Sequence, residues 1–217
     1  MNFLCLRNVS IGYSASLVSN IDAELHSGEF VCLIGRNGSG KSTLLKTLAG
    51  LMPPLKGECK LVSCDKEIRS SIVLSHLPDL PNTTVFEFVS YGRLPHLNIF
   101  SKLRQEDIEA TEQAIRQVGI ETLSKKKIMQ ISDGERQKAN IARALAQGSE
   151  FLFLDEPSAF LDYPSKHELM LLLKDLAHSH HKAILLSSHD LDLVNKYADT
   201  IWEIEGGTLN LYSNLHP

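Results

Sequence analysis

Short apolar runs separated by turn residues dominate the first part of the chain and predict β-structure. Runs of this length between Gly- and Ser-containing turns are typical of antiparallel strands. The run Phe30 to Ile34 carries no polar residue, so we expect it to be a buried strand. The expected strands cover residues 3–10, 21–25, 30–34, 58–63 and 71–75, and a helix over 42–49 follows the third strand.

From about residue 78 to residue 130 the pattern becomes helical. Thr84 and Glu87 have the spacing of a capping box, which predicts the start of a helix. Residues 105–118 are largely polar but keep an apolar stripe that Gly119 closes, so they predict a second helix. No Gly/Ser/Pro-rich linker borders this stretch. We therefore expect a helical insertion rather than a separate domain.

Uninterrupted apolar runs return in the last third of the chain. Residues 151–154 and 183–186 predict central parallel strands covered on both faces. A helix over 163–177 lies between them and predicts a right-handed β-α-β unit. Two further runs, 201–205 and 208–212, flank Gly-Gly and predict a closing hairpin. The whole pattern predicts an α/β fold.

Composition excludes several classes of protein. A formal net charge of −4 over 217 residues gives no electrostatic footprint for nucleic acid. The longest apolar runs have about five residues, far below the roughly 20 of a membrane-spanning helix. The first residues lack the pattern of a signal peptide. Four scattered cysteines suit a reducing compartment, and Cys59 and Cys64 are better explained as structural thiols than as metal ligands. We expect a soluble, cytosolic protein.

A glycine-rich loop follows directly from the buried strand over 30–34. Its glycines let backbone N–H groups converge on a phosphate, its lysine neutralises the outer phosphates, and its first hydroxyl can ligate Mg²⁺. The N-terminus of the following helix adds its dipole. A Gly/Ser-rich turn with a chance lysine is the alternative. The loop predicts a site for a nucleoside triphosphate and Mg²⁺, formed by Gly35, Arg36, Asn37, Gly38, Ser39, Gly40, Lys41, Ser42 and Thr43.

Two adjacent acids end the apolar strand over 151–154. Carboxylates at the carboxyl end of a strand in an open α/β sheet face the ligand crevice. We expect Asp155 to hold Mg²⁺ or its water and Glu156 to act as the general base on the attacking water. The alternative is that Asp-Glu-Pro only marks the start of a helix.

A second candidate anion site precedes an Ala-rich helix over about 135–147. Ser132 and Glu135 have capping-box spacing, so a well-capped helix is the simpler interpretation. Gly134 costs about 1 kcal/mol of helix propensity in this first turn. Glycine at this position is favoured where backbone comes close to a ligand, and the helix N-terminus suits an anion.

These motifs occur in the order found in ABC-type ATPases, and the resemblance covers essentially the whole chain. The Ile-Ser-Asp-Gly-Glu stretch over 131–135 resembles the family's Leu-Ser-Gly-Gly-Gln signature. The resemblance implies a P-loop NTPase (RecA-like) core with an N-terminal antiparallel β-subdomain and an inserted α-helical subdomain. It implies one domain over 1–217, with the core in 1–77 and 133–217 and the helical subdomain in 78–132.

The family assigns roles to further residues. Tyr13 matches the aromatic residue that stacks on adenine, although a strand-end tyrosine is the alternative. His189 matches the histidine that contacts the γ-phosphate, and Asp162 lies in a loop resembling the one that links the two sites. In the family, the signature of one subunit completes the ATP site of another. The resemblance therefore implies a head-to-tail dimer in which Ser132, Gly134 and Glu135 meet the partner's nucleotide.

One family position differs in this chain. ABC-type ATPases carry a glutamine that ligates Mg²⁺ after the strand expected here at 71–75, but no glutamine occurs between Thr47 and Arg104. His76, or alternatively Ser75, falls at that place. Neutral imidazole suits Mg²⁺ less well than a carbonyl oxygen does. Three later histidines, at 178, 180 and 181, are better explained by a solvated loop than by a metal site.

The stretch from Thr84 to His96 resembles the corresponding stretch of bacterial importers for iron chelates, haem and cobalamin. The alternative interpretation is a generic capped helix followed by a Gly-Arg turn. The resemblance implies an ATPase subunit at the inner face of the cell membrane. Its partners would be a second copy of the ATPase subunit in a homodimer, membrane permease subunits and, indirectly, a substrate-binding protein. Two other functions stay open: a soluble ABC-type factor acting on proteins, and a weakly active cassette.

Overall fold

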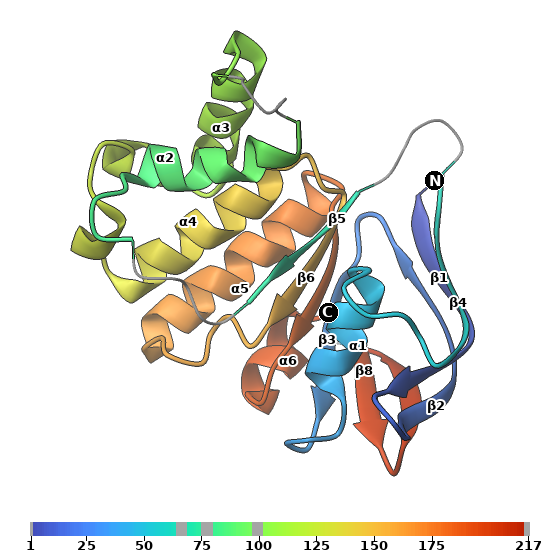
Figure 1. Cartoon of the computed structure of the whole chain (residues 1–217). Helices are drawn as coiled ribbons and strands as arrows, with labels where there is room; N and C mark the ends of the chain where they lie inside the picture. The colour runs from blue at the N-terminus through green and yellow to red at the C-terminus, as the bar shows by residue number, and fades with distance from the viewer. Residues whose placement is uncertain (1, 64–68, 75–79, 97–101, 215–217) are drawn as a thin grey trace. The chain divides into compact units, whose positions relative to one another are not determined.

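A computed structural model describes residues 2–63, 69–74, 80–96 and 102–214. The chain forms two compact units (Figure 1), which are treated separately below. The first unit contains residues 1–75, 150–159 and 170–217, and the second contains 76–149 and 160–169. The expected subdomain boundaries at residues 78 and 132 remain a prediction.

A three-stranded antiparallel sheet opens the first unit, with strand order β2-β1-β4. Its strands are β1 (Phe3–Gly12), β2 (Ser16–His26) and β4 (Lys56–Val62). Leu4 and Leu6 of β1 alternate with more exposed residues and face the core, as one covered face of an antiparallel sheet requires. Strand β2 is longer than the expected 21–25 because its polar first half pairs with the end of β1 across a register shift.

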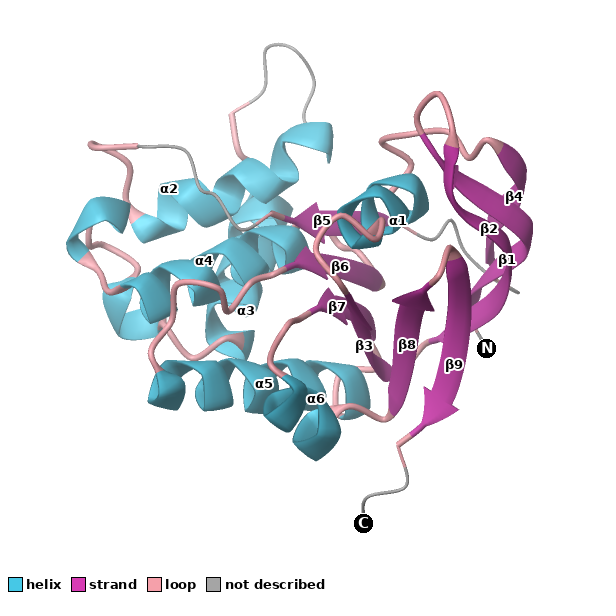
Figure 2. Cartoon of the chain, turned by 90° about the horizontal axis from the view of Figure 1, so that it is seen from below, coloured by secondary structure: helices cyan, strands magenta, loops and turns pink. Residues whose placement is uncertain are grey.

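A six-stranded sheet forms the centre of the first unit, in the order β5-β6-β7-β3-β8-β9 (Figure 2). The first five strands of this order run parallel, and β9 returns antiparallel to β8 as the predicted hairpin. Strands β3, β6 and β7 are almost wholly buried, which explains their uninterrupted apolar sequences. Their bounds are β3 Phe30–Gly35, β5 Ser70–Val73, β6 Phe151–Asp155, β7 Ala183–Ser187, β8 Thr200–Glu205 and β9 Thr208–Ser213.

One hydrophobic core joins the two sheets of the first unit. Leu44 and Leu45 of helix α1 (Lys41–Leu48) pack in it with Trp202, which is 1% exposed. Helix α1 contacts β1, β3, β6 and β7, so the helix that follows the glycine-rich loop is fixed on several sides. Helix α6 (Leu191–Tyr197) was not predicted, because seven residues are too few to show a helical period.

The second unit is helical, as the texture of residues 78–130 predicted. Helices α2, α3 and α4 pack against one another, and the 3₁₀ segment η1 lies against α4 (Figure 1). The first turns of α5 also belong to this unit. The bounds are α2 Val85–Ser90, η1 Tyr91–His96, α3 Gln105–Gln117, η2 Glu121–Leu123, η3 Ile128–Gln130, α4 Asp133–Ala146 and α5 Tyr163–His178. Among the described residues, the helices are too short and too polar to cross a bilayer.

Candidate active site

The glycine-rich loop leaves the carboxyl end of β3 and enters α1. Gly35 has φ +151°, and a Cβ there would lie 2.8 Å from the carbonyl oxygen of Ile204. Gly40 caps α1 with φ +111°, and a Cβ would lie 3.3 Å from Val18. A side chain at either position would strain the backbone or push into its neighbours, so glycine lets the loop fold tightly against β2 and β8.

Lys41 points back across the loop. Its Nζ donates hydrogen bonds to the carbonyl oxygens of Gly35 (2.8 Å) and Arg36 (3.3 Å). Burial lowers the pKa of Lys41, although the carboxylates of Glu156 and Asp155 act in the opposite direction. The lysine therefore lies within electrostatic reach of both acids.

Ser187 joins the two acids at the carboxyl edge of the sheet. Asp155, at the end of β6, lies opposite Ser187 of β7, which in turn pairs with Leu33 of β3. The buried Ser187 Oγ donates to Asp155 Oδ1 (2.9 Å) and accepts the Glu156 backbone N–H (2.8 Å). This hydroxyl orients the Asp155 carboxylate and fixes the backbone of Glu156.

Glu156 adopts a left-handed backbone conformation with φ +48°. For a residue with a side chain this conformation costs about 1–3 kcal/mol and is found preferentially at functional sites. The Glu156 Oε1 lies 2.6 Å from Nε2 of His189 in the loop after β7. The acid and the histidine predicted to act on the γ-phosphate are thus in direct contact.

Tyr13 lies at the tip of the β1–β2 hairpin with 64% of its surface exposed. The hairpin is close to the loop, because Gly40 approaches Leu17 and Val18 of β2. A hollow of about 460 Å³ borders the loop and lies in the size range of small-molecule sites. It is lined by Leu17, residues 35–39, the end of β8 and the following turn, residues 203–207.

Ser132 and Glu135 form the capping box at the start of α4. Ser132 Oγ accepts the Glu135 N–H (3.3 Å) and donates to Glu135 Oε2 (3.0 Å), which also accepts the Ser132 N–H. The backbone hydrogen bond from Ser132 lowers the pKa of Glu135, so the carboxylate stays ionised beside the helix N-terminus. Gly134 faces Ser165, whose Oγ would lie 3.3 Å from an added Cβ.

A hollow of about 300 Å³ opens at this helix end within the second unit. Ser132, Gly134 and Glu135 line it together with Lys138, Leu161, Ser165, Glu168 and Leu169. Asp162 lies just before α5 and accepts the Ser165 N–H (3.0 Å). Hydrogen bonds from the side chain and from the backbone of Ser165 lower the pKa of Asp162. Asp162 therefore caps α5, a role that the sequence analysis did not assign to it.

The predicted residues form two groups. Lys41, Asp155, Glu156 and His189 gather at one edge of the sheet in the first unit, while the signature residues and Asp162 belong to the second. His76 and Ser75 lie outside the described residues. Of the three later histidines, His178 binds Asp199 (2.8 Å), and the described residues hold no cluster suited to a metal ion.

Ser187 is the site residue whose role the sequence analysis missed. The Ser-Ser-His-Asp motif was recognised for its histidine, but the serine that ends β7 carries the contacts to both acids. A small polar residue ending an otherwise apolar buried strand was the available signal.

Comparisons with known proteins identify the family. The ABC transporter family model matches residues 18–159, more than half of the chain. An ABC transporter ATP-binding protein of Methanocaldococcus jannaschii is 41% identical over 203 residues, which cover 88% of this chain and 69% of that protein. The achromobactin transport ATP-binding protein of Dickeya dadantii is 37% identical, covering 96% of this chain and 81% of that one.

A solved structure supports the same assignment. It is described as an inward-facing conformation of a metal-chelate type ABC transporter, and its matching chain is 26% identical with a TM-score of 0.89. The match covers 99% of this chain and 84% of the other. The chain therefore belongs to the ABC transporter family as an ATP-binding subunit, an ATPase of the kind coupled to transport.

Proposed function

We propose that this chain powers the import of a metal chelate by hydrolysing ATP at a site shared between two copies. The contact between Glu156 and His189 beside the Asp155–Ser187 pair carries the proposal. This group supplies a base, a γ-phosphate partner and a carboxylate for a cation, all at the edge of the sheet that the glycine-rich loop also leaves.

The loop would bind the phosphates of ATP. Lys41 would exchange its carbonyl contacts at Gly35 and Arg36 for the outer phosphates, and the backbone amides of residues 36–43 would surround them. The hydroxyl of Ser42 and the carboxylate of Asp155 are hard oxygen donors that fit Mg²⁺. When bound, Mg²⁺ neutralises charge on the phosphates. Tyr13 would stack on the adenine.

Glu156 would accept a proton from the water that attacks the γ-phosphate. Its backbone is held by Ser187 and its carboxylate by His189, so both ends of the residue are fixed before the reaction. A base that is already oriented needs no reorganisation in the transition state. His189 would in turn hydrogen-bond the γ-phosphate.

The signature end of α4 would complete the site of a second subunit. A helix N-terminus favours an anion through its free amides and its dipole, and a hollow opens at this end of α4. Ser132, Gly134 and Glu135 would contact the partner's nucleotide, with Asp162 nearby. The capping box holds the Ser132 hydroxyl in place, so a capped helix and an anion site are compatible.

The descriptions of two similar proteins support a metal-chelate substrate and a membrane partner. One is an achromobactin transport ATP-binding protein, and the other is a metal-chelate type ABC transporter. We infer that the chain docks on permease subunits at the cytoplasmic face of the membrane and that a binding protein delivers the chelate. His76 or Ser75 would stand at the position of the missing glutamine.

The test replaces Glu156 by Gln and, as a control, Glu150 by Gln at the amino end of the same strand. Glu156→Gln should retain ATP binding and lower hydrolysis by about 10²- to 10⁴-fold. It should also trap an ATP-bound dimer in size-exclusion chromatography. Glu150→Gln should hydrolyse ATP like the unmodified protein. Undiminished turnover in Glu156→Gln would refute the assignment of the base.

The importer role needs a second measurement. Tagged protein purified from gently solubilised membranes should bring down a polytopic membrane protein, and ATP hydrolysis in that complex should rise when the loaded binding protein is added. Recovery of only soluble partners would instead favour an ABC-type factor acting on proteins.

A further inference from the structure

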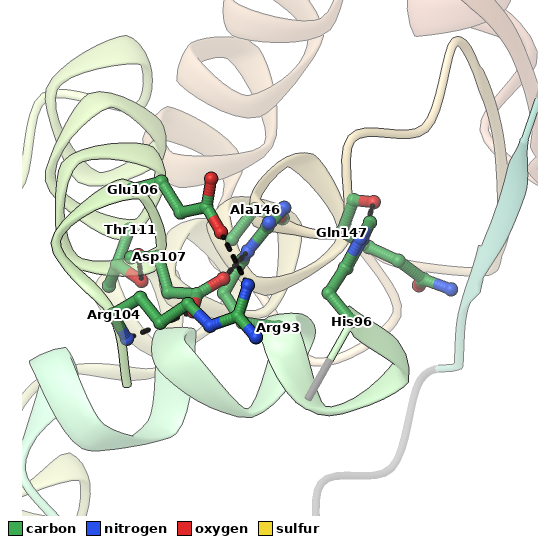
Figure 3. A network of polar contacts seen from close by, with 8 residues as sticks. All are labelled: Arg93, His96, Arg104, Glu106, Asp107, Thr111, Ala146 and Gln147. Carbon is green, nitrogen blue, oxygen red and sulfur yellow. Dashed lines mark hydrogen bonds and ion pairs between the residues drawn. The ribbon is translucent and has the colours of Figure 1, made fainter. Parts of the chain in front are cut away.

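Arg93 and His96 of η1 point toward Ala146 and Gln147 at the C-terminal end of α4 (Figure 3). An α-helix leaves its last four carbonyl groups without partners inside the helix, and these must be satisfied by other groups. At this end of α4, the carbonyl groups of Ala146 and Gln147 contact side chains that lie 53 and 51 positions earlier in the chain. The helix end is therefore fixed by a distant segment rather than by its own cap alone.

Arg93 makes the central contacts. Its Nη1 donates to the carbonyl oxygen of Ala146 (2.9 Å), and its Nε donates to Asp107 Oδ1 (2.9 Å). Both partners are largely buried, with side-chain exposures of 13% for Arg93 and 2% for Asp107. A cation at a helix C-terminus is favoured by the helix dipole. One guanidinium thus ties α4 to α3.

Gly92 and His96, on either side of Arg93 in the chain, also approach the end of α4. His96 Nε2 lies 2.9 Å from the carbonyl oxygen of Gln147, the residue that caps α4. Gly92 approaches the backbone so closely that an added Cβ would lie 2.1 Å from the Arg143 carbonyl oxygen. The guanidinium of Arg143 lies 5.1 Å from the centre of the Phe88 ring in α2. The segment therefore fits the helix end tightly and by several independent contacts.

Asp107, the acidic partner of Arg93, is itself held by hydrogen bonds at the start of α3. Its Oδ2 accepts the Arg104 N–H (3.1 Å), and its backbone carbonyl accepts the hydroxyl of Thr111 (2.7 Å). Burial raises the pKa of Asp107, but the hydrogen bonds from Arg104 and Arg93 outweigh this effect and leave the pKa below its ordinary value. The N-terminus of α3 and the C-terminus of α4 are consequently linked through the Arg93–Asp107 ion pair.

We propose that Gly92, Arg93 and His96 form a clamp that positions α4, and so sets the placement of Ser132 at its opposite end for hydrolysis in the partner's site. The inference rests on the proposed role of Ser132 across the dimer. The Gly-Arg-x-Pro-His stretch then acts on the ATPase reaction rather than on recognition of the imported molecule.

The length of α4 gives the expected size of the effect. Its 14 residues span about 20 Å, so a tilt of about 3° at the clamped end moves the other end by about 1 Å. A misplacement of about 1 Å can lower a rate by about 10²-fold. Loss of the clamp should therefore lower kcat strongly while the subunit's own phosphate loop still binds ATP.

The test uses Arg93→Met, with Arg116→Met on the exposed face of α3 as the matched control. Arg116 makes a weak ion pair with Glu112 at 3.7 Å. Arg93→Met should keep the ATP affinity of the isolated subunit and lower kcat by about 10- to 100-fold. Arg116→Met should behave like the unmodified protein. If Arg93→Met turns over normally, the clamp is refuted.

Mixed dimers show whether Arg93 acts on the partner's site or whether its replacement damages the whole subunit. Subunits that carry Arg93→Met are mixed with subunits that carry Glu156→Gln. In each mixed dimer, one site combines the intact Glu156 of the first subunit with the intact α4 of the second. Random pairing should then give about a quarter of the normal rate, well above either variant alone. The double variant mixed with unmodified subunits has no such site in its mixed dimers, so only the unmodified dimers, about a quarter of the total, should hydrolyse ATP at the normal rate.

A benchmark separates the two proposals. Ser132→Arg mixed with Glu156→Gln should recover activity in the same way if the signature acts across the dimer. Recovery with Ser132→Arg but none with Arg93→Met overturns the clamp and leaves the proposed function intact. No recovery with either overturns both.

His96 provides a second route if Arg93→Met fails to fold. Gln at position 96 keeps an N–H donor for the Gln147 carbonyl, whereas Leu does not. His96→Gln should retain kcat and His96→Leu should lose it at unchanged ATP affinity. Equal rates in these two variants would count against the clamp.

Discussion

Replacing Ser187 by Ala removes the hydroxyl that joins the two acids of the site. Two hydrogen bonds are lost: one donated to the ionised Asp155 carboxylate and one accepted from the Glu156 N–H. A bond to a charged group contributes about 1.5–3 kcal/mol and a neutral one about 0.5–1.5 kcal/mol, so the variant should lose about 2–4 kcal/mol of unfolding free energy. For a chain of this length, that corresponds to a fall in Tm of about 5–15 °C.

The turnover rate of Ser187→Ala should fall together with its stability, but its affinity for ATP should not. The free Asp155 and Glu156 would lose their fixed orientation, and we expect kcat to decrease by about 10- to 100-fold. The affinity of the phosphate loop for ATP should change little, because Lys41 and the loop amides are untouched. Thermal unfolding, equilibrium ATP binding and phosphate release measure the three quantities.

Ser188→Ala is the matched control. Ser188 is the next residue, is also buried, and its Oγ accepts the Asp190 N–H (3.1 Å). It should lose about 1 kcal/mol, or about 2–4 °C in Tm, with nearly normal turnover. Equal losses of stability and of kcat in the two variants would show that the Ser187 contacts have no special role.

The remaining predictions concern Asp107 and Tyr13. The pKa of Asp107 lies below its ordinary value of 3.8, so its stabilising effect is complete above pH 3.8 and is lost as the pH falls below that value. The free energy of unfolding in urea should therefore differ between the protein and Asp107→Asn at pH 5–6, about 1–2 units above this value, and the two should converge in acid. A difference that stays constant with pH would contradict this. Tyr13→Ala should weaken ATP binding by about 5- to 150-fold if the ring stacks on the base, since one stacking contact contributes about 1–3 kcal/mol. Tyr13→Phe should bind normally, and unchanged binding in Tyr13→Ala would exclude the stacking role.

Local patterns were sufficient where the chemistry depends on neighbouring residues. The glycine-rich loop, the capping box at Ser132 and the acid pair after β6 were all predicted from short stretches. In each case one strand end or helix start fixes the residues by covalent connection. The apolar runs of β3, β6 and β7 were likewise recognisable because buried parallel strands need no polar positions.

Contacts between distant segments could not be predicted in this way. The bond between Ser187 and Asp155 depends on the register of β6 against β7, and a shift by one residue would turn Ser187 to the other face of the sheet. The stretch around Arg93 was recognised as importer-like, but its contact with Ala146 exists only after α2, α3 and α4 have packed. The sequence of the stretch carries no sign of which helix end it meets.

The backbone of Glu156 shows how these distant contacts produce the active arrangement. A residue after the end of β6 must turn the chain out of the sheet, and glycine would do so without strain. A glutamate here accepts φ +48° because Ser187 binds its amide and His189 binds its carboxylate. The strain of about 1–3 kcal/mol is comparable to what those two bonds contribute. Stability alone therefore gives no reason for glutamate at this position, whereas the proposed role of a fixed base facing His189 does.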